Sequence, residues 1–138
     1  MIKELNRNNK NKILELSNTF PIIFDKFNIE NDFENNPFTK YLYYELDNKI
    51  VGFINYNFMY GKIEIININV LEAYQNKKIA SNLLETLINK EKDFINILLE
   101  VREDNIFAIK LYEKYGFEKI GIREKYYNKT DAIVMERK

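Results

Sequence analysis

The sequence predicts a mixed α/β fold in one domain that spans residues 1–138. Three observations support this fold class. Between Tyr41 and Val70, apolar residues recur with a period of two in three successive stretches, which is typical of antiparallel strands. A long amphipathic helix pattern follows. A short apolar run comes after the helix, so the pattern predicts a strand–helix–strand crossover within a mixed sheet.

The N-terminal region predicts a short strand and two helices. Ile2–Leu5 is the expected strand, and apolar residues near helical spacing predict a helix that ends around Phe20. Proline suits the first position of a helix, so a second helix is expected over Pro21–Phe27. Residues 28–37 are polar and rich in asparagine, and we expect a loop or a frayed helix there.

Three strands joined by tight turns follow and form an antiparallel meander. They are expected at Tyr41–Leu46, Ile50–Phe58 and Ile63–Val70. A helix with one apolar face then covers Ile79–Ile88. The remaining elements are a buried central strand at Phe94–Val101, a helix that ends at Gly116, and strands at Phe117–Arg123 and Ala132–Met135.

Composition excludes several classes of function. The chain has neither cysteine nor histidine, which excludes disulfides and thiolate catalysis and removes the commonest general base and metal ligands. We therefore expect no metal site, and proton transfer must use Asp, Glu, Lys or Tyr. The formal net charge is zero, so the chain lacks the overall positive electrostatic field that would attract nucleic acid. No apolar run of about 18 residues and no signal-peptide core occur, so we expect a cytoplasmic protein without membrane contact.

The first candidate site is the loop between the strand that ends at Val70 and the helix that begins near Ile79. A helix N-terminus presents free backbone N–H groups and a positive dipole end, which together bind phosphate. Lys77 and Lys78 add positive charge. An ordinary strand–loop–helix with two solvated lysines is the alternative interpretation.

The second candidate is Glu100. Alternation places Leu99 and Val101 on one face of the strand, and Glu100 and Arg102 on the other. Glu100 stands at the C-terminal end of a central strand, where α/β sheets commonly carry their sites. It is a candidate general base, and an ion pair with Arg102 or across strands is the alternative.

The third candidate is Tyr112. Asn105 suits the N-cap of the second helix, and Tyr112 follows seven residues later on the same face. A tyrosine there could donate a proton to a leaving group. A core aromatic residue beside Ile109 and Leu111 is the alternative.

Together these segments resemble the GNAT superfamily of N-acetyltransferases, and most closely the bacterial ribosomal-protein alanine N-acetyltransferase branch. The resemblance extends from Ile63 to Met135 and rests on INVLEAYQNKKIASNLLETLI, LLEVREDNIFAIKLYEKYGFEKIGIREKYY and DAIVM. It implies the GNAT fold, in which a mixed, mostly antiparallel sheet is splayed between its fourth and fifth strands and flanked by about four helices.

The resemblance also implies acetyl-coenzyme A (acetyl-CoA) as cosubstrate and a role for each matched residue. Glu100 matches the general base and Tyr112 the general acid. Backbone groups of Ile68, Asn69 and Val70 are expected to bind the pantetheine arm, and Asn105 to contact coenzyme A. The loop expected to wrap the pyrophosphate consists of Gln75, Asn76, Lys77, Lys78, Ile79, Ala80 and Ser81.

Two stretches depart from the family pattern. Lys78 stands where the family usually has glycine, which allows close approach of the backbone to phosphate. We expect the lysine to keep a helical backbone, and its Cβ to crowd the cofactor while its charge partly compensates. Asn128–Thr130 replaces a stretch that carries Arg and Glu in that branch, and this change affects the expected acceptor groove.

The resemblance implies acetyl transfer from acetyl-CoA to a primary amine. Without cysteine no acetyl-cysteine can form, so we expect direct attack in a ternary complex. A protein or peptide N-terminus, such as that of a ribosomal protein, is the leading acceptor, because an α-amine near pKa 8 costs about 3 kcal/mol less to deprotonate than lysine. The alternatives are a small-molecule amine acetyltransferase and a degenerate, non-catalytic coenzyme A-binding module. We expect a monomer or weak homodimer.

Overall fold

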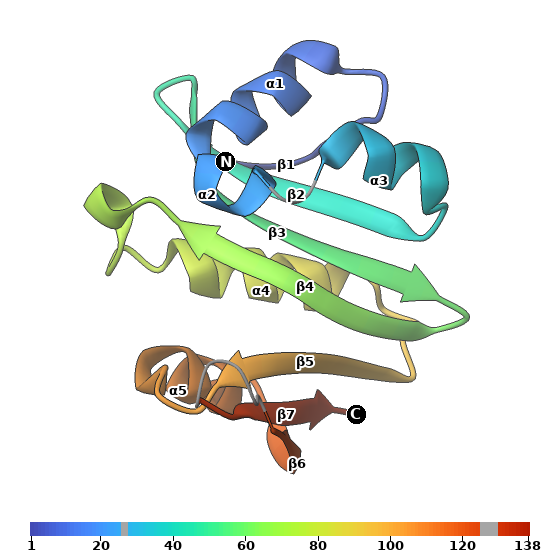
Figure 1. Cartoon of the computed structure of the whole chain (residues 1–138), viewed down its shortest axis with the longest axis vertical. Coiled ribbons are helices and arrows are strands. Elements are labelled where there is room, and N and C mark those ends of the chain that lie inside the picture. The colour runs from blue at the N-terminus through green and yellow to red at the C-terminus, as the bar shows by residue number, and fades with distance from the viewer. Residues whose placement is uncertain (26–27, 125–129) are drawn as a thin grey trace.

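The computed structural model describes residues 1–25, 28–124 and 130–138. The described residues form seven strands, five α-helices and one short 3-10 helix (Figure 1). In chain order these are β1 (Ile2–Glu4), α1 (Lys10–Thr19), α2 (Pro21–Phe24), α3 (Ile29–Asn35), β2 (Thr39–Leu46), β3 (Lys49–Met59), β4 (Lys62–Val70), η1 (Glu72–Tyr74), α4 (Ile79–Lys90), β5 (Asn96–Arg102), α5 (Ile106–Lys114), β6 (Glu118–Arg123) and β7 (Ala132–Arg137). No helix in these parts of the chain is long and apolar enough to cross a membrane.

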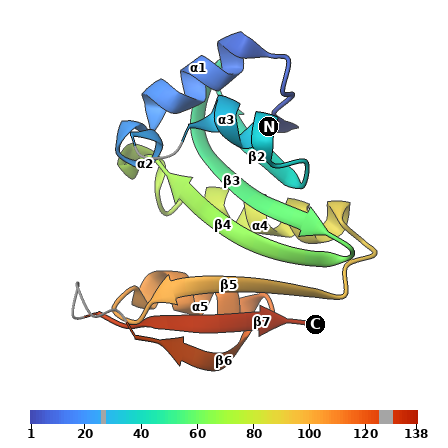
Figure 2. The ribbon, with the colours of Figure 1, turned by 45° about the vertical axis from the view of Figure 1, so that its right-hand side comes forward.

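The strands form one sheet in the order β1-β2-β3-β4-β5-β7-β6. The β4–β5 pair is parallel, and the other neighbouring pairs are antiparallel. Helices α1 to α3 lie on one face of the β1–β4 half, and α4 lies on the opposite face (Figures 1 and 2). Each face has its own core: Leu16, Phe33 and Phe53 are buried on the first, and Leu83 and Leu99 on the second.

The sheet opens between β4 and β5. Their pairing covers only Lys62–Glu64 on β4 and Asn96–Leu98 on β5, and the strands diverge toward their C-terminal ends (Figure 2). A β-bulge contributes to this divergence. Asn55 of β3 pairs with Asn67 and the next residue pairs with Ile65, so Ile66 is an extra residue that bends β4. The predicted splay between the fourth and fifth strands is confirmed.

The order of elements follows the sequence prediction, with one clear error at α3. Residues 28–37 were expected to be a loop or a frayed helix, but a capped helix forms there. The Asn28 side chain accepts a hydrogen bond from the backbone N–H of Asn31 at 3.1 Å. Ile29 and Phe33, four residues apart, are both buried beneath the helix. Two apolar residues were too few to stand out in a polar segment.

Two expectations concern segments that the structure describes only in part. The second helix was expected to reach Phe27, but α2 ends at Phe24, and residues 26–27 are not described. The expected change of the acceptor groove at Asn128–Thr130 also lies outside the described residues, except for Thr130.

Candidate active site

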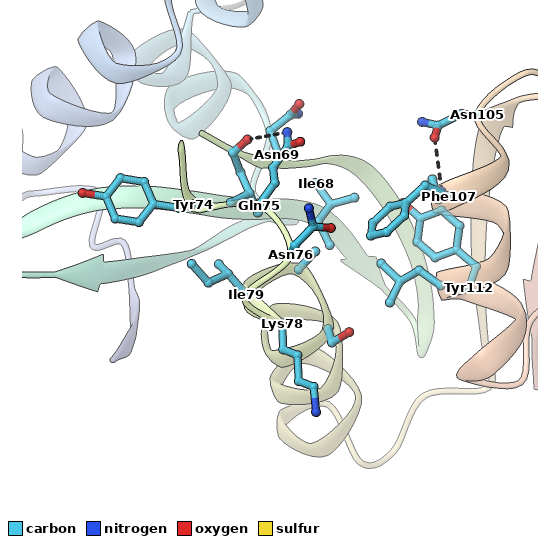
Figure 3. A pocket seen from close by; sticks show the side chains of 15 residues that line it. Ile68, Asn69, Tyr74, Gln75, Asn76, Lys78, Ile79, Asn105, Phe107 and Tyr112 are labelled. Carbon is cyan, nitrogen blue, oxygen red and sulfur yellow. Dashed lines mark hydrogen bonds between the residues drawn. The ribbon is translucent and has the colours of Figure 1, made fainter. Parts of the chain in front are cut away.

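A cleft of about 500 Å³ opens where β4 diverges from β5 (Figure 3). Its walls come from three segments that are distant in sequence: the end of β4, the loop that leads into α4, and the first two turns of α5. The residues that line it are Ile68, Asn69, Val70, Tyr74, Gln75, Asn76, Lys78, Ile79, Ala80, Ser81, Asn105, Phe107, Ala108, Leu111 and Tyr112. The cleft therefore gathers ten of the eleven residues that the resemblance assigns to the donor site.

The exception is Lys77. It does not line the cleft, and its ammonium nitrogen lies 5.5 Å from the centroid of the Tyr74 ring. Tyr74 itself is a cleft residue at the end of η1. Lys77 thus holds its positive charge against a cleft residue through a cation–π contact.

The N-terminus of α4 faces the cleft with free backbone donors. The first N–H that bonds within the helix is that of Asn82, which donates to the carbonyl of Lys78 at 3.0 Å. The N–H groups of Ile79, Ala80 and Ser81 precede it, and none of the side chains that the structure describes caps this helix. Free donors and the positive end of the helix dipole make this wall suited to a phosphate group.

Lys78 precedes this helix in the left-handed conformation, with φ 62° and ψ 20°. The expectation of a helical backbone at this position is therefore wrong. The loop must reverse direction to enter α4, and glycine adopts such a φ without steric cost, whereas a residue with Cβ does not. Its side chain extends along α4, away from the other labelled side chains of the cleft (Figure 3).

Asn105 and Tyr112 occupy the α5 wall. The Asn105 side chain accepts a hydrogen bond from the N–H of Ala108 at 3.2 Å, so the predicted N-cap is confirmed. Tyr112 is only 5 % exposed and packs against Phe117, with ring centroids 5.7 Å apart. Burial raises the pKa of Tyr112 to about 12, which keeps the phenol protonated at neutral pH. It is thus a core aromatic residue and a cleft residue at once.

Glu100 lies on the other face of β5. Leu99 and Val101 are buried in the core that contains Tyr112, and Glu100 points the opposite way, as alternation predicts. Nη1 of Arg123 lies 3.1 and 3.3 Å from the two carboxylate oxygens of Glu100. Arg102 instead pairs with Asp104 at 3.0 Å. A cross-strand ion pair therefore exists, and Glu100 keeps 40 % of its side chain exposed.

The sequence interpretation missed Phe107 and Tyr74. Phe107 is 69 % exposed in the first turn of α5, and both Phe107 and Tyr112 line the cleft (Figure 3). An aromatic residue outside the apolar stripe of a helix was the available signal for Phe107. Tyr74 had no comparable signal, because its place depends on how η1 folds back on β4.

Known proteins are similar to this chain in both sequence and fold. The model of the "Acetyltransferase (GNAT) family" matches residues 10–117. A ribosomal protein bS18-alanine N-acetyltransferase from Haemophilus influenzae is 39% identical over 111 residues, which cover 74% of this chain and 75% of that protein. The crystal structure of the ribosomal-protein-S18-alanine N-acetyltransferase from Escherichia coli has a TM-score of 0.83 at 25% identity, covering 99% of this chain and 92% of that one.

A second solved structure extends the comparison of folds. An aminoglycoside 6'-N-acetyltransferase complexed with coenzyme A has a TM-score of 0.81, covering 99% of this chain and 96% of that one. Its sequence identity is 19%, so this likeness concerns the fold alone.

Proposed function

The chain belongs to the GNAT acetyltransferase family and is an acetyl-CoA-dependent N-acetyltransferase, and we propose that it acetylates the α-amino group of a protein or peptide N-terminus. The observation that carries the proposal is the cleft between β4 and β5, bounded by the free N-terminus of α4. Its walls place the free N–H groups that begin α4 next to a stretch of β4 that β5 does not pair. Acetyl-CoA has matching parts, a pyrophosphate and an amide-bearing pantetheine arm.

In this proposal each wall binds one part of the donor. The N–H groups that begin α4, at residues 79–81, hold the pyrophosphate. The end of β4 at Ile68–Val70 lies beyond the stretch paired with β5, so its backbone groups that point away from β3 face the pantetheine amides. One of them, the Val70 carbonyl, also accepts a hydrogen bond from Nε2 of Gln75 at 3.2 Å. Asn105 and Phe107 contact the arm from α5. The acetyl group then lies toward the interior of the splay, near Tyr112.

Glu100 receives the proton of the attacking amine. The α-amine must be neutral to attack, and its ordinary pKa near 8 leaves a useful neutral fraction. Attack on the thioester carbonyl gives a tetrahedral intermediate whose nitrogen loses a proton to Glu100, directly or through water. Arg123 orients the carboxylate through the contacts to both of its oxygens.

Tyr112 assists the departure of sulfur by hydrogen bonding. Collapse of the intermediate re-forms the carbonyl and breaks the carbon–sulfur bond, and the pair of electrons leaves on the thiolate. Its conjugate thiol has a pKa near 8.5 if it behaves like cysteine, whereas that of Tyr112 is about 12, so complete proton transfer would be uphill by roughly 5 kcal/mol. In place of the full proton transfer expected of a general acid, the Tyr112 phenol donates a hydrogen bond to the developing thiolate, and water supplies the final proton.

The relatives support an α-amine acceptor. Their names specify the alanine of a ribosomal protein, and lysine side chains are harder to deprotonate by about 3 kcal/mol. Acetyl-CoA and a panel of peptides that differ at the N-terminal residue, each containing one lysine, test this assignment by mass spectrometry. The matched control is each peptide with a blocked N-terminus. We expect acetylation at the α-amine alone; modification of blocked peptides, or faster turnover of free polyamines, would contradict the proposal.

A further inference from the structure

We propose that Gly52 of β3 is a positioning residue for the donor site, because the space left by its missing side chain sets how closely the walls of the cleft approach one another. This inference rests on the proposed binding of acetyl-CoA in the cleft. Gly52 is buried and pairs with Tyr44 on β2 and Val70 on β4.

Three atoms crowd the place where a side chain would begin. A Cβ at Gly52 would lie 3.1 Å from Cγ2 of Ile79, 3.2 Å from the carbonyl oxygen of Asn69 and 3.3 Å from Cγ2 of Val70. All three residues line the cleft. Ile79 is the first residue of α4, so its contact fixes the helix end that carries the free N–H groups.

Glycine is required at position 52 because there is little room for a side chain, and not because the backbone conformation is unusual. Gly61 and Gly116 have φ of 81° and 87° and serve turns, whereas the φ of Gly52 is not in that left-handed region. A methyl group at Gly52 would push the neighbours by a few tenths of an ångström. The Asn69 oxygen belongs to the backbone and cannot rotate away, so part of the shift passes to β4.

Such a shift separates two walls that must bind one ligand together. The α4 N-terminus would hold the pyrophosphate while the end of β4 holds the pantetheine arm, and Gly52 packs beneath both. Since hydrogen bonds to an extended ligand depend on their spacing, displacement of one wall weakens the other contact as well. The three atoms nearest to a Cβ at Gly52 belong to neither Glu100 nor Tyr112, so we expect the chemical step to be spared once the donor is bound.

The test is Gly52→Ala, with Gly121→Ala as the matched control. A Cβ at Gly121 would meet no heavy atom of the described residues within 4 Å, and Gly121 lies on β6, which contributes no residue to the cleft lining. We expect the Kd for acetyl-CoA of G52A to rise about 10-fold, with kcat at saturating donor within about twofold of the unmodified protein. G121A keeps both values. Calorimetric titration and steady-state kinetics measure them, and circular dichroism confirms folding.

A double-mutant cycle with Val70→Ala checks the steric cause. Removing Cγ2 of Val70 relieves one of the three close contacts, so G52A should raise Kd less in the V70A background. If G52A alone does not fold, the comparison of V70A with the G52A/V70A double variant supplies the measurement. A folded G52A with unchanged Kd, even at a lower Tm, would overturn the proposal, as would an equal loss of affinity in G121A. Failure of the unmodified protein to bind acetyl-CoA would instead overturn the proposed function.

Discussion

Lys78→Gly should stabilise the protein, because Lys78 holds the left-handed conformation before α4. A residue with Cβ in that region costs about 1–2 kcal/mol. Glycine relieves this strain but loses about 0.5–1 kcal/mol through the greater freedom of the unfolded chain. The net gain expected is about 0.5–1 kcal/mol, which raises Tm by about 2–4 °C for a chain of this size.

Lys77→Gly is the matched control for this prediction. Lys77 is the neighbouring exposed lysine, and its φ is not positive, so glycine there relieves no strain. K77G removes the same charge, and with it the cation–π contact to Tyr74, and should lower the unfolding free energy by at least about 0.5–1 kcal/mol. Asn76, with φ 66°, should gain less from glycine than Lys78, since asparagine tolerates this region better than lysine.

Urea unfolding and thermal scans without ligand measure these differences, and calorimetric titration follows acetyl-CoA. Lys78 lines the cleft, but its side chain extends along α4 and away from the other labelled cleft side chains (Figure 3), so K78G should keep its Kd within about threefold, as expected when an exposed charge is lost. A K78G variant that is no more stable than K77G would refute the backbone reasoning. A loss of affinity beyond about 30-fold, on the order of 2 kcal/mol, would refute the placement of the side chain.

Three further predictions concern the cleft and the proposed chemistry. Tyr112→Phe and Glu100→Gln should each lower kcat by about 10- to 100-fold and leave the Kd for acetyl-CoA within about twofold, and normal turnover of both would exclude these roles. Phe107→Ala should raise that Kd about 5- to 10-fold by removing an exposed ring from the wall, whereas Ile106→Ala, exposed but outside the cleft, should not. At alkaline pH the folded pKa of Tyr112, about 12, exceeds its ordinary value of 10, so its stabilising contribution is complete below pH 10 and falls as pH rises toward 12. Y112F should therefore lose less unfolding free energy over that pH range in urea titrations.

Periodicity made most of the fold predictable. Side chains along β2, β3 and β4 alternate between the two faces of the sheet, and this alternation determines which core each one joins. The apolar stripe of α4 places Leu83 and Leu87 against the sheet. The same alternation placed Glu100 correctly opposite Leu99. These features depend on residues close in sequence, so short stretches of the chain contain the information needed.

Features that depend on distant parts of the chain were not predictable. Arg123 reaches Glu100 across β7, and this strand order does not follow from any local pattern. The turn into α4 requires the left-handed backbone of Lys78, whereas a residue with a Cβ atom disfavours that conformation. The crowding around Gly52 similarly requires knowing that Ile79 packs onto β3.

The short β4–β5 pairing gives the sheet an internal edge. An outer edge strand offers its free N–H and C=O groups to any other chain, and this exposure favours unwanted strand pairing. At β4 the free groups lie in the middle of a seven-stranded sheet, beyond the stretch paired with β5 and beside the N-terminus of α4. Another protein strand would have to enter the cleft between β4 and α5 to pair with them. The fold thus leaves unpaired backbone groups accessible to a narrow ligand, in a place that is harder for a β-strand to reach than an outer edge.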